Sequence, residues 1–275
     1  MAQQPTPPRT RPRPNFRELE VLNVASITPH MKRLTLGGEN LAGFEPSGPA
    51  THFKMFFPQP GLERTVVSEW GPDGPVMPDG FERPQSRTYT PRRMDSKALE
   101  LDIDFVMHGD GVGSDWVNGT KPGNYITIAG PGKSFFHIDM EADWYVIIGD
   151  DSALPAIGTI LDALPAGGKA HVYSEVTEKA DEQQLESAAE VEFTWLHRGP
   201  GTAMPGKLLE ETVYKVELPK EGRGCIYVAC EAGIMRDMRK HFIGERGIDP
   251  TQVTTRGYWK QSAVNHPDND YGVDA

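Results

Sequence analysis

The hydrophobic pattern of the chain changes near His137, and this change limits the possible folds more than any other feature. Before it, short apolar or alternating runs are separated by segments rich in glycine and proline, which is typical of antiparallel strands. We therefore predict an antiparallel barrel or sandwich between residues 15 and 139. Six runs are expected to form its strands: residues 16–24, 31–36, 52–58, 86–91, 99–107 and 125–129.

After this change, continuous apolar runs alternate with helical stretches. A run at residues 144–148 ends in Gly149, as a strand covered on both faces does, and a helical stretch follows it. Alternation of this kind predicts a parallel sheet with helices on both faces, over residues 140–262. The expected strands are 144–148, 171–176, 191–196, 225–229 and one that ends at Trp259, and the expected helices are 153–164, 182–188 and 232–245.

The chain is thus expected to have two domains, one β and one α/β, with a tail at each end. Residues 1–14 are rich in proline and arginine and are read as a disordered tail, and residues 263–275 as a flexible tail. Within the first domain, apolar and acidic residues alternate strictly at residues 99–105. This pattern predicts a strand with one buried face and one solvated face.

Composition excludes several classes of function. The net charge of −11 argues against a nucleic-acid partner, because phosphate binding needs a basic field. No run approaches the roughly 18 apolar residues of a membrane span, and the N-terminus lacks the apolar core of a secretory signal. The spacing of Cys225 and Cys230 favours two free thiols in a reducing cytoplasm, and the histidines show no metal-ligand spacing. We therefore expect a cytoplasmic protein without a membrane contact or a protein-bound metal.

The segment Arg87-Thr88-Tyr89-Thr90 carries groups suited to a flat, phosphate-bearing cofactor. Alternation in an extended strand places Arg87 and Tyr89 on one face and the threonines on the other. Tyr89 offers a ring face, Arg87 a fork for a phosphate oxygen, and Thr90 a hydroxyl at the ring edge. An ordinary exposed strand is the alternative interpretation.

A glycine-rich segment follows the strand at residues 99–107. Gly109, Gly111 and Gly113 let the backbone approach a ligand closely, and Ser114 stands where the N-cap of a helix is expected. The start of a helix presents free N–H groups to a phosphate. A glycine-rich hairpin with a capping serine is the alternative.

Acidic residues occupy the ends of three expected strands in the second domain. Asp150 and Asp151 follow the first strand, where open α/β sheets bind ligands, although the dinucleotide fingerprint of three spaced glycines is missing. Glu175 ends the second strand and is suited to accept from a ribose 2′-OH, which favours NADH over NADPH. An exposed acidic residue without a role is the alternative there. Glu231 is either a helix cap or a nicotinamide contact.

Several segments together resemble the siderophore-interacting protein family, the bacterial flavin-dependent ferric-siderophore reductases. In chain order they read HFKMFFP, SRTYTPRR, DFVMHGDGVGSDWV, ITIAGPGKSF, WYVIIGDDSALPAI, TWLHRG, CEAGIMRDMR and GYWKQ, from about residue 15 to residue 261. The resemblance implies a ferredoxin-reductase-like architecture, in which a six-stranded Greek-key barrel binds FAD and an α/β domain binds a nicotinamide nucleotide.

The resemblance also implies roles for single residues. Lys54, Lys133 and Lys260 match a basic triad that attracts the anionic iron chelate in related reductases. The family more often has Glu-Thr where Asp151-Ser152 stand in this chain. The cofactor-binding residues expected from the patterns and the resemblance together are Arg87, Thr88, Tyr89, Thr90, His108, Gly113, Ser114, Trp116, Asp150, Asp151, Ser152, Ala153, Glu231 and Trp259.

These expectations combine into one leading hypothesis. Bound FAD would take a hydride from NADH or NADPH, or electrons from a ferredoxin, and pass them one at a time to a ferric siderophore, so that iron leaves as Fe(II). No catalytic side chain is required, and a monomer is expected. One alternative is a general NAD(P)H flavin reductase or diaphorase with a protein or free-flavin acceptor. Another is a non-catalytic siderophore-binding iron carrier.

Overall fold

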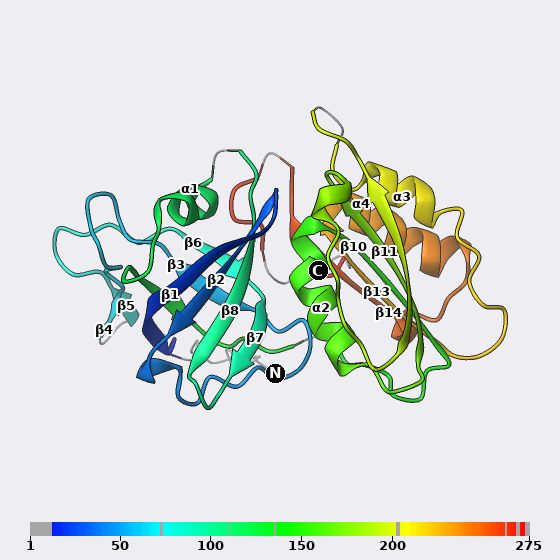
Figure 1. Cartoon of the computed structure of the whole chain (residues 1–275), viewed down its shortest axis with the longest axis horizontal. Helices are drawn as coiled ribbons and strands as arrows, with labels where there is room; N and C mark the ends of the chain where they lie inside the picture. The colour runs from blue at the N-terminus through cyan, green and yellow to red at the C-terminus, as the bar shows by residue number, and fades with distance from the viewer. Residues whose placement is uncertain are drawn as a thin grey trace, which may run out of the picture.

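The computed structural model describes residues 13–71, 74–109, 111–134, 136–201, 204–261, 263–267 and 270–272. Two lobes lie side by side, each built around a β-sheet (Figure 1). The sheet of the first lobe draws its strands from residues 16 to 129, and that of the second lobe from residues 144 to 259. The change of hydrophobic pattern near His137 therefore falls between the two sheets.

The first lobe contains a seven-stranded sheet in which every pair of neighbouring strands is antiparallel. The strand order is β6-β3-β9-β1-β2-β8-β7. A small hairpin of β4 (Glu69–Gly71) and β5 (Gly74–Val76), the 3-10 helix η1 (Glu39–Leu41) and the helix α1 (Val112–Gly119) complete the lobe. The strands are β1 (Phe16–Thr28), β2 (Met31–Gly37), β3 (Phe53–Phe56), β6 (Ser86–Tyr89), β7 (Pro91–Asp95), β8 (Glu100–Val106) and β9 (Tyr125–Ala129).

The antiparallel barrel was predicted correctly, but the count of six strands is one too low. The strand expected at residues 86–91 is interrupted at Thr90, because β6 pairs with β3 whereas β7 pairs with β8. The two edges of the sheet are therefore consecutive in the chain. Thr90 is buried at this junction and joins them.

The alternation in β8 places its apolar side chains inward, as expected. Leu101, Ile103 and Phe105 are buried in the core of the first lobe. The acidic face is not solvated as we predicted, since Asp102 and Asp104 are buried as well. Arginine and threonine side chains from β2 and β7 bond both carboxylates and exclude water from them.

The second lobe contains a five-stranded parallel sheet with the order β12-β11-β10-β13-β14. Tyr145 and Ile147 face α2 on one side of the sheet, while Val146 and Ile148 face α4 on the other. Helices thus cover both faces, as predicted (Figure 1). The elements are β10 (Trp144–Asp150), η2 (Asp151–Ala153), α2 (Leu154–Ala163), β11 (Lys169–Val176), η3 (Lys179–Asp181), β12 (Glu190–His197), α3 (Lys207–Val213), β13 (Gly224–Glu231), α4 (Ala232–Lys240), the π-helix η4 (His241–Glu245), η5 (Pro250–Gln252) and β14 (Val253–Trp259).

One predicted helix is absent and one helix was missed. Residues 182–188 form no helix, because the single turn of η3 ends at Asp181 and the polar segment after it packs only Leu185 on the core. The missed helix is α3. It has only seven residues, too few to show a helical repeat of apolar residues in the sequence.

The two lobes meet along α2, which lies at their boundary (Figure 1). The backbone N–H of Ala50 donates to Thr159 Oγ1 at 3.0 Å, and Arg92 forms an ion pair with Asp162 at 2.6 Å. A Cβ at Gly158 would lie 2.5 Å from Arg92 Nε, so the glycine leaves room for the Arg92 side chain in its present position. Contacts on one helix thus fix the position of the lobes around the space between them.

Described residues of the C-terminal segment contact the second lobe, and the flexibility of the tail stays a prediction. Gly257 N donates to Asp270 O at 2.9 Å, and Thr255 Oγ1 donates to Tyr271 O at 2.6 Å. Of the predicted N-terminal tail, residues 1–12 lie outside the described residues. Among the helices that the structure describes, none has the length and apolar character needed to cross a membrane.

Candidate functional site

A cleft of about 600 Å³ lies between the lobes and receives side chains from both. Its volume falls within the roughly 300–1,000 Å³ of small-molecule sites. Most of the residues that the sequence singled out meet in it. The predicted residues that line the cleft are Arg87, Thr88, Tyr89, Thr90, His108, Gly113, Ser114, Asp151, Ser152, Trp259 and Lys260.

Tyr89 is the aromatic group of the first lobe in this cleft. Its ring packs against Phe105, with ring centroids 4.4 Å apart. Burial raises the pKa of the Tyr89 hydroxyl above its ordinary value, against a smaller opposing effect of Arg87, so the phenol stays neutral at physiological pH. A Cβ at Gly113 would lie 2.3 Å from Tyr89 Oη, so only glycine allows α1 to approach the ring this closely.

The helix after the glycine-rich segment begins earlier than predicted. Its N-cap is Gly111, which supplies no capping side chain, and Ser114 lies within the first turn rather than at the cap. The first N–H groups of a helix lack intrahelical partners and favour anions. Trp116 does not line the cleft and instead packs edge-on against Phe57 on the core of the first lobe, with ring centroids 5.9 Å apart.

The loop after β10 divides into an exposed and a buried part. Asp151 and Ser152 line the cleft, whereas Asp150 and Ala153 are completely buried beneath it. Asp150 accepts hydrogen bonds from Ser152 N at 3.0 Å and from Trp259 Nε1 at 2.8 Å. Burial, with the nearby charge of Asp151, raises the pKa of Asp150 to about 7 despite these donors.

Glu231 is the N-cap of α4. Its Oε2 accepts from Gly233 N at 2.6 Å and from Ile234 N at 3.0 Å. Its other oxygen accepts from Gln261 N at 3.2 Å. The side chain is buried and does not line the cleft, so of the two interpretations left open by the sequence the structure supports the helix cap.

The predicted ribose contact of Glu175 is wrong. This carboxylate is fully buried and accepts from Gly206 N at 2.6 Å and from Leu209 N at 2.9 Å, at the start of α3. Arg198 lies 3.7 Å from it and separates it from the cleft. Glu175 therefore gives no reason to prefer NADH over NADPH as the electron donor.

One of the three predicted lysines lines the cleft. Lys260 is exposed and lines the cleft. Lys54 is not among the residues that line the cleft, but it donates to Thr88 Oγ1, which is, at 2.7 Å. Lys133 is exposed and is not among the residues that line the cleft. The triad thus stays a prediction, with Lys260 as the member that faces the cleft.

Two cleft arginines were missed by the sequence analysis. Arg198 follows β12 at the carboxyl end of the sheet and forms an ion pair with Asp151 at 2.5 Å. Arg256 lies in β14, and its Nη2 is 3.2 Å from Nδ1 of His52 in the first lobe. Because arginine has no acceptor, the ring nitrogen of His52 accepts this bond. The position of Arg198 directly after the carboxyl end of β12 was the available signal for that residue. Arg256 lies in the middle of β14 and gave no such signal.

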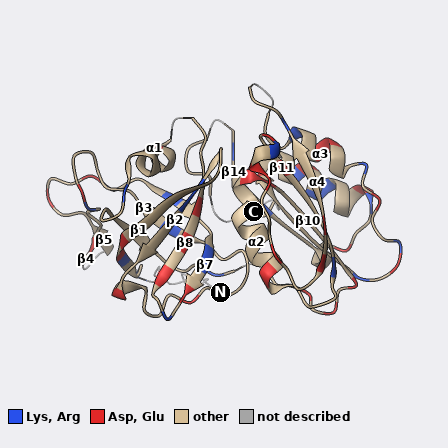
Figure 2. Ribbon diagram, in the orientation of Figure 1, with Lys and Arg blue, Asp and Glu red and all other residues tan. Residues whose placement is uncertain are grey.

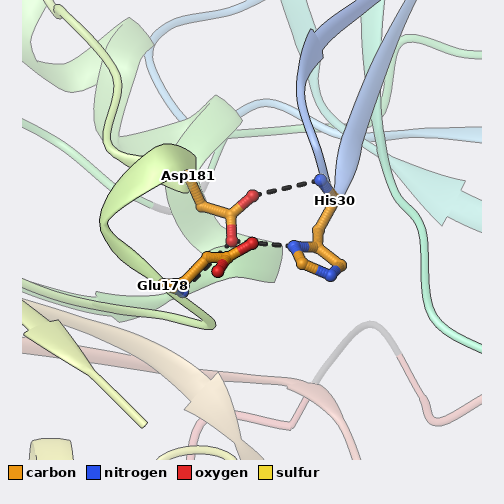
Figure 3. Close-up of side chains that lie close together, drawn as sticks. All are labelled: His30, Glu178 and Asp181. Carbon is orange, nitrogen blue, oxygen red and sulfur yellow. Dashed lines mark hydrogen bonds and ion pairs between the residues drawn. The ribbon is translucent and has the colours of Figure 1, made fainter. Parts of the chain in front are cut away.

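A histidine and two acids come together at one side of the cleft. His30 lies in the turn between β1 and β2, and Asp181 ends η3 in the other lobe (Figure 3). Asp181 accepts from His30 N at 3.0 Å and contacts His30 Nδ1 at 2.8 Å. Burial would raise the pKa of Asp181, but these bonds from His30 lower it overall.

The same cluster has the dimensions of a cation site but is already internally bonded. Possible ligand atoms of His30, Glu178 and Asp181 lie within 4.8 Å of one another. Glu178 and Asp181 form a capping box, each accepting a backbone N–H from the other. We therefore interpret the cluster as a helix cap joined to a hydrogen bond between the lobes.

Charge is distributed without a broad basic face in the view of Figure 2, where Lys and Arg alternate with Asp and Glu over both lobes. An anionic ligand therefore depends on the cations of the cleft itself. These are Arg87, Arg198, Arg256 and Lys260.

Two protein-family models match the chain, one for each lobe. A model described as a siderophore-interacting FAD-binding domain matches residues 20–135. A model described as siderophore-interacting protein matches residues 142–262.

Characterised relatives and solved structures agree with these matches. The ferric vibriobactin reductase of Vibrio cholerae is 31% identical over 89% of this chain and 89% of its own length. The NADPH-dependent ferric-chelate reductase of Escherichia coli K12 is 31% identical over 92% of this chain and 96% of its own. The crystal structure of a siderophore utilization protein from T. fusca has a TM-score of 0.81 and 34% identity, covering 92% of this chain and 95% of that chain.

Proposed function

The chain belongs to the siderophore-interacting protein family, and we propose that it is an FAD-dependent reductase that removes iron from ferric siderophores. The observation that carries this proposal is the cleft between the lobes. There the Arg87-Thr88-Tyr89-Thr90 segment of the first lobe lies opposite Trp259 and Lys260 of the second. Such a cleft is suited to hold a flat cofactor from one lobe and a second molecule between the lobes.

The residues present fit FAD. Because Gly113 has no Cβ, the start of α1 packs directly against Tyr89, and the Tyr89 ring and the first turn of α1 lie next to each other in the cleft. Tyr89 and Thr90 would contact the flavin ring, Arg87 would bind the diphosphate, and the uncapped N-terminus of α1 would support it with backbone N–H groups. When bound, FAD supplies the transfer of single electrons to ferric iron, whose reduction weakens its binding to hard oxygen ligands.

The chain's own residues would act on the substrate through charge and shape. Lys260, with the paired Arg198, presents positive charge to an anionic chelate, against a chain of net charge −11. Each partly exposed cation contributes on the order of 1 kcal/mol. Lys54 and Lys133 are proposed as further attracting charges outside the cleft. Asp151 and Ser152, at the carboxyl end of β10, would face NADH or NADPH.

The proposal also includes the electron donor, the cellular location and the oligomeric state. The electron donor is a nicotinamide nucleotide, with a ferredoxin as the alternative donor. The protein works in the cytoplasm, where such donors are available. It acts as a monomer, since each chain provides both sides of the cleft.

A visible spectrum combined with a reduction assay tests the proposal. Gently purified protein should show flavin absorbance that bleaches with NADPH or NADH, and adding a ferric siderophore should restore it with release of Fe(II). Activity with free flavin but not with ferric chelates would favour a general flavin reductase. Protein that binds a ferric siderophore but never holds flavin would be an iron carrier and would contradict the proposal.

Arg87→Ala tests how the cofactor is held. Loss of a charge-assisted contact with the diphosphate should weaken FAD binding about tenfold or more, while the far-ultraviolet circular dichroism stays unchanged. Flavin content after dialysis is the measurement. A variant that keeps its full flavin content would show that Arg87 does not bind the diphosphate.

A further inference from the structure

Two buried carboxylates hold the chain on either side of Lys260. On one side, the indole Nε1 of Trp259 donates to Asp150 Oδ2 at 2.8 Å. On the other side, the backbone N–H of Gln261 donates to Glu231 Oε1 at 3.2 Å. The two carboxylates are themselves linked, because Glu231 N donates to Asp150 Oδ2 at 3.2 Å. Lys260 thus sits in a short segment fixed at both neighbouring positions.

Neither carboxylate is placed to bind a ligand directly. Asp150 is 0% exposed and Glu231 is 3% exposed, and neither lines the cleft. Their oxygens are engaged by donors from the β10–α2 loop, the start of α4 and the end of β14. Lys260, by contrast, is exposed and lines the cleft. The two buried carboxylates thus hold the segment, whereas the exposed Lys260 can reach a ligand.

Electrostatics alone would make these carboxylates a disadvantage for an anionic substrate. Burial and the charge of Asp151 raise the pKa of Asp150 towards neutrality, so ionising it inside the protein is unfavourable. Any negative charge on Asp150 or Glu231 also opposes an anion in the cleft above. Their presence beneath the cationic end of β14 therefore calls for a role that outweighs the repulsion.

We propose that Asp150 and Glu231 are positioning residues that fix Lys260 in the cleft to receive an anionic ferric chelate. This inference rests on the proposed function. A lysine on a mobile end of β14 would lose rotational and backbone freedom on binding the chelate. Holding positions 259 and 261 in place removes part of that entropy cost before the substrate arrives. The carboxylates act on the substrate only through Lys260.

The sign of the effect on KM separates positioning from charge. Asp150→Asn and Glu231→Gln each remove a carboxylate near the cleft, which on Coulomb grounds should lower KM for an anionic chelate. Positioning predicts the opposite, namely that KM for an anionic ferric tris-catecholate rises about fivefold, as in Lys260→Ala. With a neutral ferric tris-hydroxamate, KM should change less than about twofold in all three variants.

A double-mutant cycle tests whether the effect passes through Lys260. Asp150→Asn combined with Lys260→Ala should raise KM for the anionic chelate no further than Lys260→Ala alone. Glu231→Gln serves as an independent test if Asp150→Asn fails to fold. Glu192→Gln, whose carboxylate is 78% exposed on β12, controls for the loss of one negative charge.

The outcomes are distinct for the inference and for the proposed function. A wild-type protein that reduces no ferric chelate would contradict the proposed function. An active wild type with Asp150→Asn and Glu231→Gln variants whose KM falls or stays unchanged would overturn the positioning role. The role would also be overturned if KM rose equally for anionic and neutral chelates, or if the effects of Asp150→Asn and Lys260→Ala were additive.

Discussion

At the scale of single residues, Asp150 links stability to pH. Its carboxyl group is fully buried, and its pKa is raised from 3.8 to about 7. Between these two values the folded chain holds a proton that the unfolded chain has lost. The free energy of unfolding therefore falls as pH rises through this window and is level above it. Ser152 and Trp259 donate to the carboxylate and oppose the shift, while Asp151 and Glu175 add to it.

We expect Asp150→Asn to gain stability relative to wild type as pH rises, because asparagine cannot ionise. Each pKa unit corresponds to about 1.4 kcal/mol, so the difference in Tm, variant minus wild type, should increase by on the order of 5 °C between about pH 5 and about pH 8. Thermal unfolding of both proteins at the two pH values is the measurement. A difference that is independent of pH would show that Asp150 does not carry this proton.

For single residues, the sequence predicted position better than role: whether the cleft residues contact a cofactor stays a prediction. Arg87, Tyr89 and Thr90 were expected to form a cofactor surface, and all of them line the cleft. Glu175 was misjudged because an acidic residue at the end of a strand looks the same whether it faces a ligand or caps a helix. Its partners, the N–H groups at the start of α3, come from about thirty residues further along the chain.

At the scale of elements, α1 offers a matched pair of glycines. A Cβ at Gly113 would collide with Tyr89 Oη at 2.3 Å, whereas a Cβ at Gly119 meets no atom within 4 Å. Alanine favours a helix over glycine by roughly 1 kcal/mol at either position. We expect Gly113→Ala to displace the Tyr89 ring and weaken FAD binding about tenfold or more, while Gly119→Ala keeps its flavin. Fluorescence titration with FAD measures both, and equal affinities would show that this contact does not shape the site.

The cap of α3 gives a second prediction at this scale. Glu175→Gln leaves one oxygen to serve Gly206 N and Leu209 N, and it removes the charge that faces Arg198. We expect a loss of roughly 1–3 kcal/mol in the free energy of unfolding. The ratio of kcat/KM for NADH to that for NADPH should stay within about twofold of wild type, since the side chain contacts no ribose.

Denaturant unfolding and steady-state kinetics check these two expectations for Glu175→Gln. Glu192→Gln is the control, because its side chain is 78% exposed and should leave both quantities unchanged. A marked change in the preference between NADH and NADPH in Glu175→Gln, but not in Glu192→Gln, would show that Glu175 does take part in nucleotide binding.

At the scale of the whole molecule, sequence patterns predicted the two sheets but not the surface between them. The pattern of apolar residues, alternating in β8 and continuous in β10, lies within each strand. Each of these strands could therefore be predicted separately from the sequence. The cleft, in contrast, joins residues 87–90 to residues 256–261, which meet only when both lobes are folded and packed along α2. Arg256 was missed for this reason, since its contact with His52 has no counterpart in local sequence.

The contact between the lobes can be isolated by comparing two similar caps. Asp181 accepts from the backbone N–H of the N-cap residue Glu178 and also from His30 across the lobes. Among the described residues, the Asp249 side chain accepts from Thr251, within the second lobe. Alanine at either position should remove a cap worth about 1 kcal/mol. We expect Asp181→Ala alone to lose contact between the lobes as well, with a lower Tm, a broader transition and faster release of FAD from the shared cleft. Calorimetry and flavin release by dilution measure the difference, and two variants that behaved alike would show that the lobes are held together without His30 and Asp181.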